Sequence, residues 1–439
     1  MIPPGESSPA PLDTSLTNSV DARATRNARL SLALLLSINL FNYVDRTVLA
    51  AVVPRIRETF FPNAGVHGDL GLTGTLATAF ILSYMIAAPI FGWLADRMSR
   101  WVLAGISVIL WSIFTGCSGL ATTFTVLVMT RAMVGIGEAG YGPSAPTIIA
   151  DLYPVERRGS VLAWFYMAIP VGSAVGYVLG GQIAAMLNWR WAFFAVVPPG
   201  ILMGLLCFFM KDPARGSGNQ AAPRPTARWK DYLKLLRNRS YVLDTLGMAA
   251  MTFAIGGISF WMPTYIAEVR RAGDLAHVNL VFGGITIVAG IAATLLGGIA
   301  GDKLRPRYSG SYFLVSGIGI LLACPFVLLM LVVPFPYAWG CFFVAEFFLF
   351  FNTGPSNTIL ANVTHPSVRA TAFAMNIFVI HALGDAPSPP LLGSIADHFG
   401  WNAAFCVVTA LLAIGGVLWL IGSQFLAEDG AAAARQSVG

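Results

Sequence analysis

The sequence predicts an all-helical (all-α) membrane protein, with twelve membrane-spanning helices in two pseudo-symmetric six-helix bundles. Three observations lead to this fold class: an apolar composition, regularly spaced apolar segments, and motifs that occur once in each half of the chain. Hydrophobic residues make up 56% of the 439 residues and charged residues only 11%, and the mean hydropathy is +0.70. Soluble globular domains are about 25% charged, so this composition favours a multi-pass membrane protein.

Twelve apolar segments are long enough to cross a bilayer, which takes about 20 helical residues. They cover 29–50, 70–95, 101–121, 123–149, 160–186, 190–210, 241–266, 278–300, 311–333, 337–361, 368–396 and 401–425. We therefore expect one bundle over 28–210 and a second over 241–426. Their flanks are polar, so we expect a disordered tail over 1–27, a cytoplasmic linker over 211–240 and a cytoplasmic tail over 427–439.

Lys and Arg residues predict the orientation of these helices. The formal net charge is +6, and most basic residues fall in loops on the same side as the two termini. Because basic loops stay in the cytoplasm, we expect both termini to be cytoplasmic. The positive charge then requires no nucleic-acid partner. We expect a monomer in a bacterial inner membrane, in contact with membrane lipids.

The positions of Lys, His and Cys exclude several other classes of protein. An ATP-driven pump would need a Gly-Lys-Ser/Thr loop, and none of the four lysines follows a glycine. An intramembrane metalloprotease would need His-Glu-x-x-His, and none of the five histidines precedes a glutamate. The five cysteines lie singly in apolar runs. We therefore expect no enzymatic activity, no cofactor, no metal site and no disulfide.

Three short motifs recur at a spacing of 206 to 212 residues. The pairs are Gly92–Arg97 with Gly298–Lys303, Trp189–Phe194 with Trp401–Cys406, and Gly142-Pro143-Ser144 with Gly354-Pro355-Ser356. This repeat predicts that one six-helix unit has been duplicated. Two such units with a site at their interface, near the bilayer midplane, form the architecture of alternating-access carriers.

Four charged residues lie within the expected membrane spans of the first half: Asp45, Arg46, Arg131 and Glu138. Each costs roughly 2.5–3.5 kcal/mol to insert at the bilayer centre, so they mark a functional site. Arg131 and Glu138 are seven residues apart and share one helix face. We expect the four to form a network in which Arg46 and Arg131 bind an anionic substrate and Asp45 and Glu138 carry the proton. The alternative is a purely structural ion network.

The equivalent positions in the second half are aromatic, because Phe343 corresponds to Arg131 and Phe350 to Glu138. A charged wall facing an aromatic wall suits an amphiphile with an anionic head and an apolar tail. We add five candidate substrate-binding residues to the two arginines: Tyr43, Tyr141, Phe343, Phe347 and Trp261. The alternative for these aromatic side chains is contact with lipid or neighbouring helices.

The second half contains three further polar candidates. His381 and Asp385 are four residues apart on one helix face, so they could share a proton or a hydrogen bond. Glu346 is flanked by Phe and Ala, so it is either partly neutral or paired with a base elsewhere. Local hydrogen bonding is the alternative to a transport role for all three.

The turn Gly92 to Arg100 resembles the loop signature of the major facilitator superfamily, and Gly298 to Lys303 resembles its second copy. The small residues allow close approach of two helices, and the acid can pair with bases or helix ends. We therefore predict a gate latch formed by Asp96, Arg97, Arg100, Asp302 and Lys303.

Three longer stretches resemble the Spinster family of that superfamily: Asn39–Ala50, Gly137–Leu152 and Phe165–Tyr177. The resemblance implies a lipid-type carrier, because family members are associated with sphingolipid phosphates or lysophospholipids, and proton coupling is proposed for some. The family's charged residues correspond to the four already singled out. The chain departs from the animal members at Gly142-Pro143, where they have Ser or Thr.

We therefore expect a secondary active carrier that uses the proton gradient to export or flip an amphiphilic, anionic, lipid-like molecule by alternating access. The alternative is a proton-linked symporter or antiporter for a small organic anion, because an Asn-Tyr-x-Asp-Arg span also occurs in such carriers. A sensor that borrows the carrier architecture would need no titratable charge network.

Overall fold

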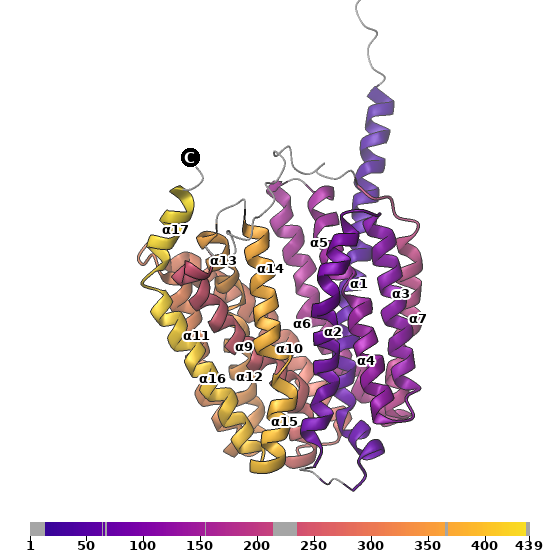
Figure 1. Ribbon diagram of the computed structural model, residues 1–439, viewed down its shortest axis with the longest axis vertical. Helices are drawn as coiled ribbons and strands as arrows, with labels where there is room; N and C mark the ends of the chain where they lie inside the picture. The colour runs from indigo at the N-terminus through magenta and orange to yellow at the C-terminus, as the bar shows by residue number, and fades with distance from the viewer. Residues whose placement is uncertain are drawn as a thin grey trace, which may run out of the picture.

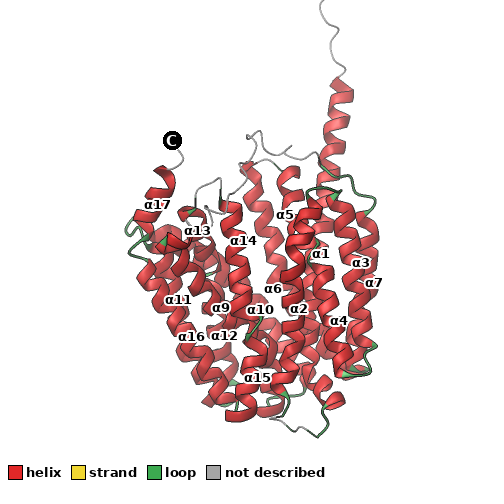
Figure 2. Ribbon diagram, viewed as in Figure 1, coloured by secondary structure: helices red, strands yellow, loops and turns green. Residues whose placement is uncertain are grey.

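The computed structural model describes residues 14–63, 65, 68–153, 155–213, 235–364 and 368–435. These residues form helices joined by short loops (Figure 2). The N-terminal bundle contains α1 (Thr14–Phe60), α2 (Leu70–Ala95), α3 (Arg100–Gly119), α4 (Phe124–Glu138), α5 (Tyr141–Leu152), α6 (Val155–Met186) and α7 (Trp189–Cys207). The C-terminal bundle contains α9 (Arg239–Thr264), η1 (Tyr265–Val269), α10 (Leu275–Leu304), α11 (Ser311–Val332), α12 (Tyr337–Phe351), α13 (Thr353–Val363), α14 (Arg369–Ile380), η2 (His381–Asp385), α15 (Ser388–Phe399), α16 (Trp401–Gly422) and α17 (Leu426–Arg435).

Nine helices among the described residues are long and apolar enough to cross a membrane. The other three expected spans are interrupted: 123–149 is divided into α4 and α5, 337–361 into α12 and α13, and 368–396 into α14, η2 and α15. Pro143 and Pro355 lie in the first turn of the second helix of their pairs. Proline is tolerated there but cannot donate the hydrogen bond that would continue the preceding helix.

The N-terminal tail differs from the expectation. Helix α1 begins at Thr14, so part of the segment expected to be disordered is helical. No proline or glycine occurs between Thr14 and Arg26, and the first span therefore continues as a helix into its polar flank. Most of the expected linker, residues 214–234, lies outside the described residues.

Side chains that cap helix ends explain where several elements begin and end. Thr123, Asn188, Asn238 and Asp274 each accept a hydrogen bond from a backbone N–H in the first turn of α4, α7, α9 and α10, which satisfies donors that have no partner within the helix.

Two arginines cap helix C-termini by donating hydrogen bonds to backbone carbonyls. Arg190 Nη1 donates to the carbonyls of Gly119, at 2.9 Å, and Ala121 at the end of α3. Arg270 Nη1 donates to the carbonyls of Met330, at 2.6 Å, and Leu331 at the end of α11. In both bundles, therefore, an arginine satisfies helix-end acceptors that have no partner within their own helix.

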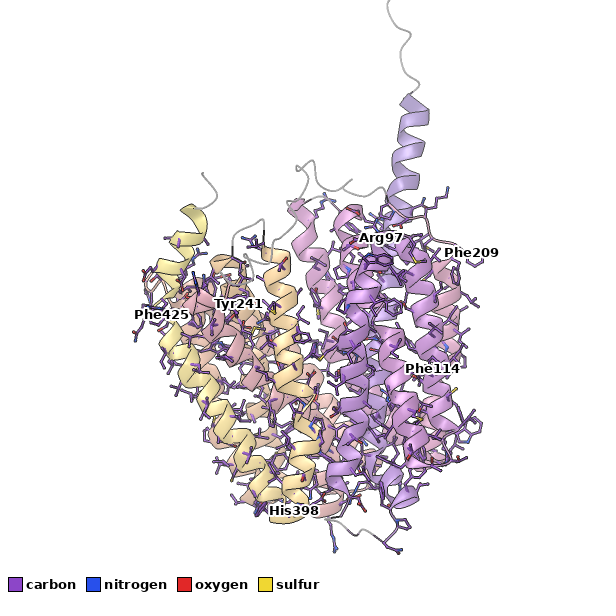
Figure 3. The ribbon with its side chains drawn as sticks, in the orientation of Figure 1. Arg97, Phe114, Phe209, Tyr241, His398 and Phe425 are labelled. Carbon is purple, nitrogen blue, oxygen red and sulfur yellow. The ribbon has the colours of Figure 1, made fainter. Side chains whose placement is uncertain are left out.

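Both described ends of the chain lie on one side of the molecule, which we call the terminal face (Figure 1). Arg97 lies near this face and His398 lies at the opposite face (Figure 3). Figure 1 shows the two bundles diverging toward the terminal face and converging where α15 meets α2. Glycines permit this convergence: a Cβ on Gly74 would lie 2.5 Å from the carbonyl carbon of Pro389.

Polar contacts join the bundles near the opposite face. Arg57 of α1 forms an ion pair with Glu268 of η1, with 2.7 Å between Nη1 and Oε2. The carboxylate of Asp397 in α15 accepts hydrogen bonds from the backbone N–H groups of Leu70 and Gly71, at 3.0 and 2.9 Å. These two contacts tie α1 and the start of α2 to the C-terminal bundle on that side.

Candidate functional site

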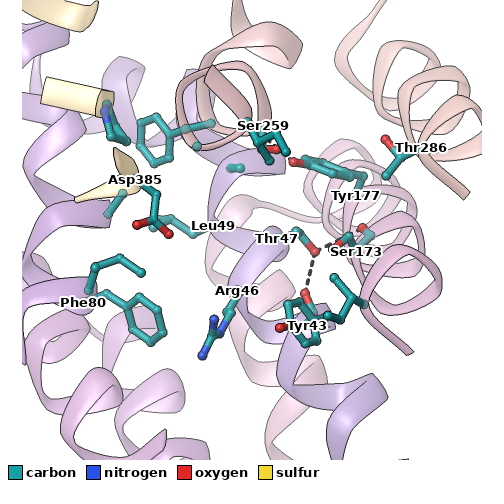
Figure 4. Close-up of a pocket in the computed structure, with 18 of the residues that line it drawn as sticks. Tyr43, Arg46, Thr47, Leu49, Phe80, Ser173, Tyr177, Ser259, Thr286 and Asp385 are labelled. Carbon is teal, nitrogen blue, oxygen red and sulfur yellow. Dashed lines mark hydrogen bonds between the residues drawn. The ribbon is translucent and has the colours of Figure 1, made fainter. Parts of the chain in front are cut away.

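A cavity of about 240 Å³ lies between the bundles (Figure 4). Its N-terminal wall comes from α1, α2, α4 and α6, and its C-terminal wall comes from α9, α10, α12, η2 and α15. Of the residues predicted to bind substrate, Tyr43, Arg46 and Arg131 line it. The structure therefore has a cavity at the interface position expected from the repeat.

Arg46 is paired and surrounded by aromatic rings. Its Nε donates a hydrogen bond to Glu138 Oε2 at 2.8 Å. Its guanidinium carbon lies 5.3, 5.0 and 5.4 Å from the ring centroids of Tyr43, Phe80 and Tyr84, which are favourable cation–π distances. The Glu138 side chain is fully buried behind Arg46, which is 23% exposed toward the cavity.

Arg131 is buried and has unused hydrogen-bond donors. The residue is 1% exposed, and its Nε and Nη1 atoms have no hydrogen-bond partner among the described residues. Its guanidinium carbon lies 5.4 Å from the ring centroid of Phe80. A buried guanidinium with free donors is costly unless an anion pairs with it, so Arg131 is the strongest anion-binding candidate in the cavity wall.

Asp45 is close to this pair but faces away from the central cavity. It is 2% exposed, and its Oδ2 accepts a hydrogen bond from Thr115 Oγ1 at 2.8 Å. It lies within electrostatic range of Arg131 and Glu138. The expected network of four therefore consists of one direct ion pair, Arg46 with Glu138, and two neighbouring charges that are not hydrogen-bonded to each other in the part of the chain the structure describes.

Two of the expected aromatic substrate contacts are engaged elsewhere. The Tyr141 hydroxyl donates to the carbonyl of Leu35 at 2.6 Å, and Trp261 Nε1 donates to the carbonyl of Pro389 at 2.7 Å. Neither residue lines the central cavity. Their polar atoms join helices within their own bundles, so the structure does not place these two residues at the cavity as expected, and their contact with substrate remains a prediction.

The aromatic wall expected from α12 is also different. Phe343 and Phe347 do not line the cavity, whereas Phe350 does. Phe347 packs against Phe348 and Phe351, with ring centroids 5.4 and 5.6 Å apart. Helix α12 therefore presents a single ring to the site, and this ring occupies the position equivalent to Glu138.

Several hydroxyl groups in the wall were not anticipated from the sequence: Thr47, Ser173, Tyr177, Thr252, Ser259 and Thr286. Isolated Ser, Thr and Tyr residues are common in membrane helices, where they bond to the helix backbone. Thr47 does so here, donating to the Tyr43 carbonyl at 2.8 Å. Only the folded arrangement brings these residues together.

The secondary polar candidates lie on the C-terminal side of the cavity. His381 Nδ1 lies 2.9 Å from Asp385 Oδ1, so the contact expected from their spacing is present, and Asp385 lines the cavity. Glu346 Oε1 accepts a hydrogen bond from Thr286 Oγ1 at 2.8 Å. Thr286 lines the cavity and Glu346 lies behind it, so the described partner of this acid is a hydroxyl group and not a base.

Three of the expected gate residues, Arg97, Arg100 and Asp302, make side-chain contacts on their own side of the bundle interface. Arg100 Nη1 pairs with Asp151 Oδ2 at 2.6 Å and its Nη2 with Asp212 Oδ1 at 2.9 Å. It thus joins the start of α3 to the end of α5 and to the chain after α7. The Arg97 guanidinium carbon lies 4.0 Å from the ring centroid of Trp93.

The second copy of the loop motif has simpler surroundings. Asp302 accepts a hydrogen bond from the Tyr312 hydroxyl at 2.8 Å. Lys303 is exposed, as is Asp96 in the first copy. The gate role of these residues remains a prediction.

Comparisons with known proteins agree with this architecture. Residues 35–389 match the family described as Major Facilitator Superfamily. The chain is 35% identical to Protein spinster homolog 3 of Danio rerio, over 93% of this chain and 87% of that protein. It is 34% identical to Sphingosine-1-phosphate transporter SPNS2 of Danio rerio, over 91% of this chain and 84% of that protein.

Two solved structures share the fold. A bacterial homologue of the human lysosomal transporter Spinster, in an inward-facing and unoccupied conformation, has a TM-score of 0.81 at 21% identity and covers 92% of this chain and 98% of its own. A D-xylose-proton symporter has a TM-score of 0.73 at 18% identity and covers 89% and 96%. From the family match, the curated relatives and the shared fold, we conclude that this chain belongs to the Spinster family of Major Facilitator Superfamily transporters, which are membrane carriers and not enzymes.

Proposed function

We propose that this transporter moves an amphiphilic, anionic, lipid-like molecule of the lysophospholipid or sphingolipid-phosphate type through the cavity between its bundles. The observation that carries the proposal is Arg131, a buried guanidinium in the cavity wall whose Nε and Nη1 have no hydrogen-bond partner among the described residues. Guanidinium groups bind phosphate and carboxylate oxygens through two parallel hydrogen bonds. The name of one relative, a sphingosine-1-phosphate transporter, supports a lipid phosphate as the substrate class.

The substrate head group would be held by both arginines of the wall. Arg131 offers free donors, and Arg46 becomes available when Glu138 releases it. A proton that binds Glu138 removes the negative charge that holds Arg46, so protonation and anion binding favour each other. Asp45, in electrostatic range of Glu138 and Arg131, would be the second proton-carrying group. The remaining wall is rich in apolar side chains, which suits an acyl chain.

Transport would follow alternating access of this cavity to the two sides of the membrane. Contacts such as Arg57 with Glu268 would have to break when the opposite face opens. We propose that both termini are cytoplasmic, in a bacterial inner membrane, as the basic loops indicate. The contacts near the opposite face would then belong to an inward-facing state of a monomer, with residues 211–240 as the cytoplasmic linker.

The second candidate is a proton-linked symporter or antiporter for a small organic anion. The size of the cavity favours it: about 240 Å³ is below the roughly 300–1,000 Å³ of pockets for drug-sized ligands. A lipid in this cavity would need to leave its tail between the helices or in the bilayer, whereas a small anion would fit completely.

Uptake into proteoliposomes separates the two candidates. Labelled lysophospholipid and a labelled sugar acid would be offered in parallel, each with and without a pH gradient. We expect uptake of the lysophospholipid, accelerated by the gradient. Uptake of the sugar acid alone would favour the second candidate, and uptake of neither compound would contradict both.

A further inference from the structure

A second, smaller cavity lies inside the N-terminal bundle. It measures about 10 Å³, and it lies between α1, α3 and α7, on a different side of α1 from Arg46. Its wall consists of Phe41, Asp45, Trp111, Ser112, Thr115, Val196 and Gly200. A water molecule needs about 10–15 Å³ of such space and at least two polar partners, so the cavity is large enough for one.

Asp45 has an unused acceptor at this cavity. Its Oδ2 accepts from Thr115 Oγ1, but Oδ1 has no hydrogen-bond partner among the residues that the structure describes. Asp45 is 2% exposed, and it lines the small cavity and not the central one. A buried carboxylate oxygen without a donor is unfavourable, and the small cavity is the space from which a donor can reach it.

Ser112 and Gly200 provide the second partner and the space. Ser112 Oγ donates its hydrogen to the Val108 carbonyl at 2.7 Å, which leaves its lone pairs available as acceptors. Gly200 on α7 faces Ser112, and a Cβ at this position would collide with Ser112 Oγ. Glycine therefore keeps the cavity open at a place where any larger residue would fill it.

We propose that this cavity binds one water molecule, hydrogen-bonded to Asp45 Oδ1 and Ser112 Oγ, and that this water is the proton partner of Asp45. When Asp45 is ionised, the water donates one hydrogen to Oδ1 and the other to Ser112 Oγ. When Oδ1 carries a proton, its O–H donates to the water oxygen. Both protonation states are satisfied in the same space, without movement of α3 or α7. The proton-partner role rests on the proposed proton coupling, whereas the water site itself does not.

The surroundings of Asp45 place this water apart from the substrate. The charged groups acting on Asp45 are Arg46 on its own helix and Arg131 and Glu138 on α4. The residues of α3 and α7 that line the small cavity carry hydroxyl, indole or apolar side chains and no charge. Asp45 would therefore bind and release its proton on the uncharged side of α1, while the substrate head group is bound at the central cavity.

Gly200→Ala tests the site by filling it, without removing a titratable group. Gly204→Ala is a matched control, because it lies one turn further along α7, where a Cβ would approach Ile109 Cγ1 at 2.6 Å outside the cavity. In crystal or cryo-electron microscopy maps that resolve water, we expect a peak bonded to Asp45 Oδ1 and Ser112 Oγ in the wild type and Gly204→Ala, and none in Gly200→Ala. Absence of the peak from the wild type would overturn the water site.

Transport measurements test the role of the water. Counterflow exchanges labelled for unlabelled substrate without net proton movement, whereas proton-driven uptake requires proton release. We expect Gly200→Ala to keep counterflow and to reduce the rate of proton-driven uptake about ten-fold, because Oδ1 of the ionised Asp45 is left without a donor while Oδ2 keeps Thr115. Ser112→Ala removes one partner while leaving the space open, and we expect the same loss in weaker form. Gly204→Ala should preserve both rates.

An equal loss of counterflow and proton-driven uptake in Gly200→Ala, with Gly204→Ala unaffected, would overturn the proton-partner role. The two proposals can also fail separately. A wild-type protein with an ordered water at Asp45 but no proton-driven uptake would contradict the proton-coupled function and leave the water site supported.

Discussion

The two bundles share one frame but differ in chemistry. The helix that ends at Glu138 and the helix that ends at Phe351 are interrupted within one residue of the same repeat position, and Arg190 and Arg270 each cap a helix C-terminus. In the N-terminal bundle this frame holds Arg46, Arg131 and Glu138 around the cavity. The equivalents of the latter two are Phe343 and Phe350. The two bundles therefore share a frame, whereas the positions of Arg131 and Glu138 carry charge in the N-terminal bundle alone.

The largest effect is expected from removing the charge at position 131. Arg131→Met deletes donors that would bind the substrate head, and hydrogen bonds to charged groups contribute about 1.5–3 kcal/mol each. We expect initial uptake of lysophospholipid in proteoliposomes to fall by about 100-fold. Phe343→Met, the equivalent change in the C-terminal bundle, should change uptake by less than about two-fold, because Phe343 does not line the cavity. An equal loss of uptake in both variants would support the sequence-based expectation that Phe343 contacts the substrate.

Neutralising the two buried glutamates compares the bundles directly. Glu138→Gln removes the partner of Arg46, and we expect proton-driven uptake to fall about ten-fold while counterflow persists. Glu346→Gln alters an acid whose described partner is a hydroxyl, and we expect a smaller loss. Wild-type proton-driven uptake in Glu138→Gln would show that the coupling assignment is wrong.

The contacts that join the bundles at the opposite face should affect the conformational equilibrium without affecting the charged residues that bind substrate. Asp397→Ala removes the acceptor for two backbone N–H groups of α2, which should favour the state open at the opposite face by about 1–3 kcal/mol. Spin-label distances between α2 and α15 would report the shift, and substrate affinity at equilibrium would serve as the control. Unchanged distances would mean that Asp397 does not hold this face closed.

The smallest effects should be equal in the two bundles. Arg190→Ala and Arg270→Ala each leave helix-end carbonyls without their donor, and each should cost about 1–2 kcal/mol of stability. Thermal unfolding in detergent measures this loss, with Arg55→Ala as a control, because the ion pair of that arginine within the described residues is with exposed Glu58 on the same helix. A large loss for one capping arginine alone would break the equivalence.

Much of the fold could be predicted from the sequence, because the length of the apolar segments and the internal repeat each have one dominant physical cause. The charged residues of the candidate site could also be singled out from the sequence, because inserting Arg131 and Glu138 into a membrane costs free energy whichever way their side chains point. The direction of the other side chains could not be predicted from the sequence. Whether Tyr141 faces the cavity or the Leu35 carbonyl depends on a helix rotation that composition does not record. The hydroxyl groups of the wall, such as Ser173 and Thr286, give no signal before α6 and α10 meet.

The rings around Arg46 have a consequence for how the carrier responds to its medium. The guanidinium is enclosed by Tyr43, Phe80 and Tyr84, and Arg131 is buried beside it. Mobile electrolyte screens exposed charges over about 10 Å at 0.1 M, but it screens enclosed charges far less. The affinity for an anionic head group inside the protein should therefore vary little with ionic strength. Binding of the same lipid to exposed basic residues at the membrane surface should instead weaken steeply as salt is added.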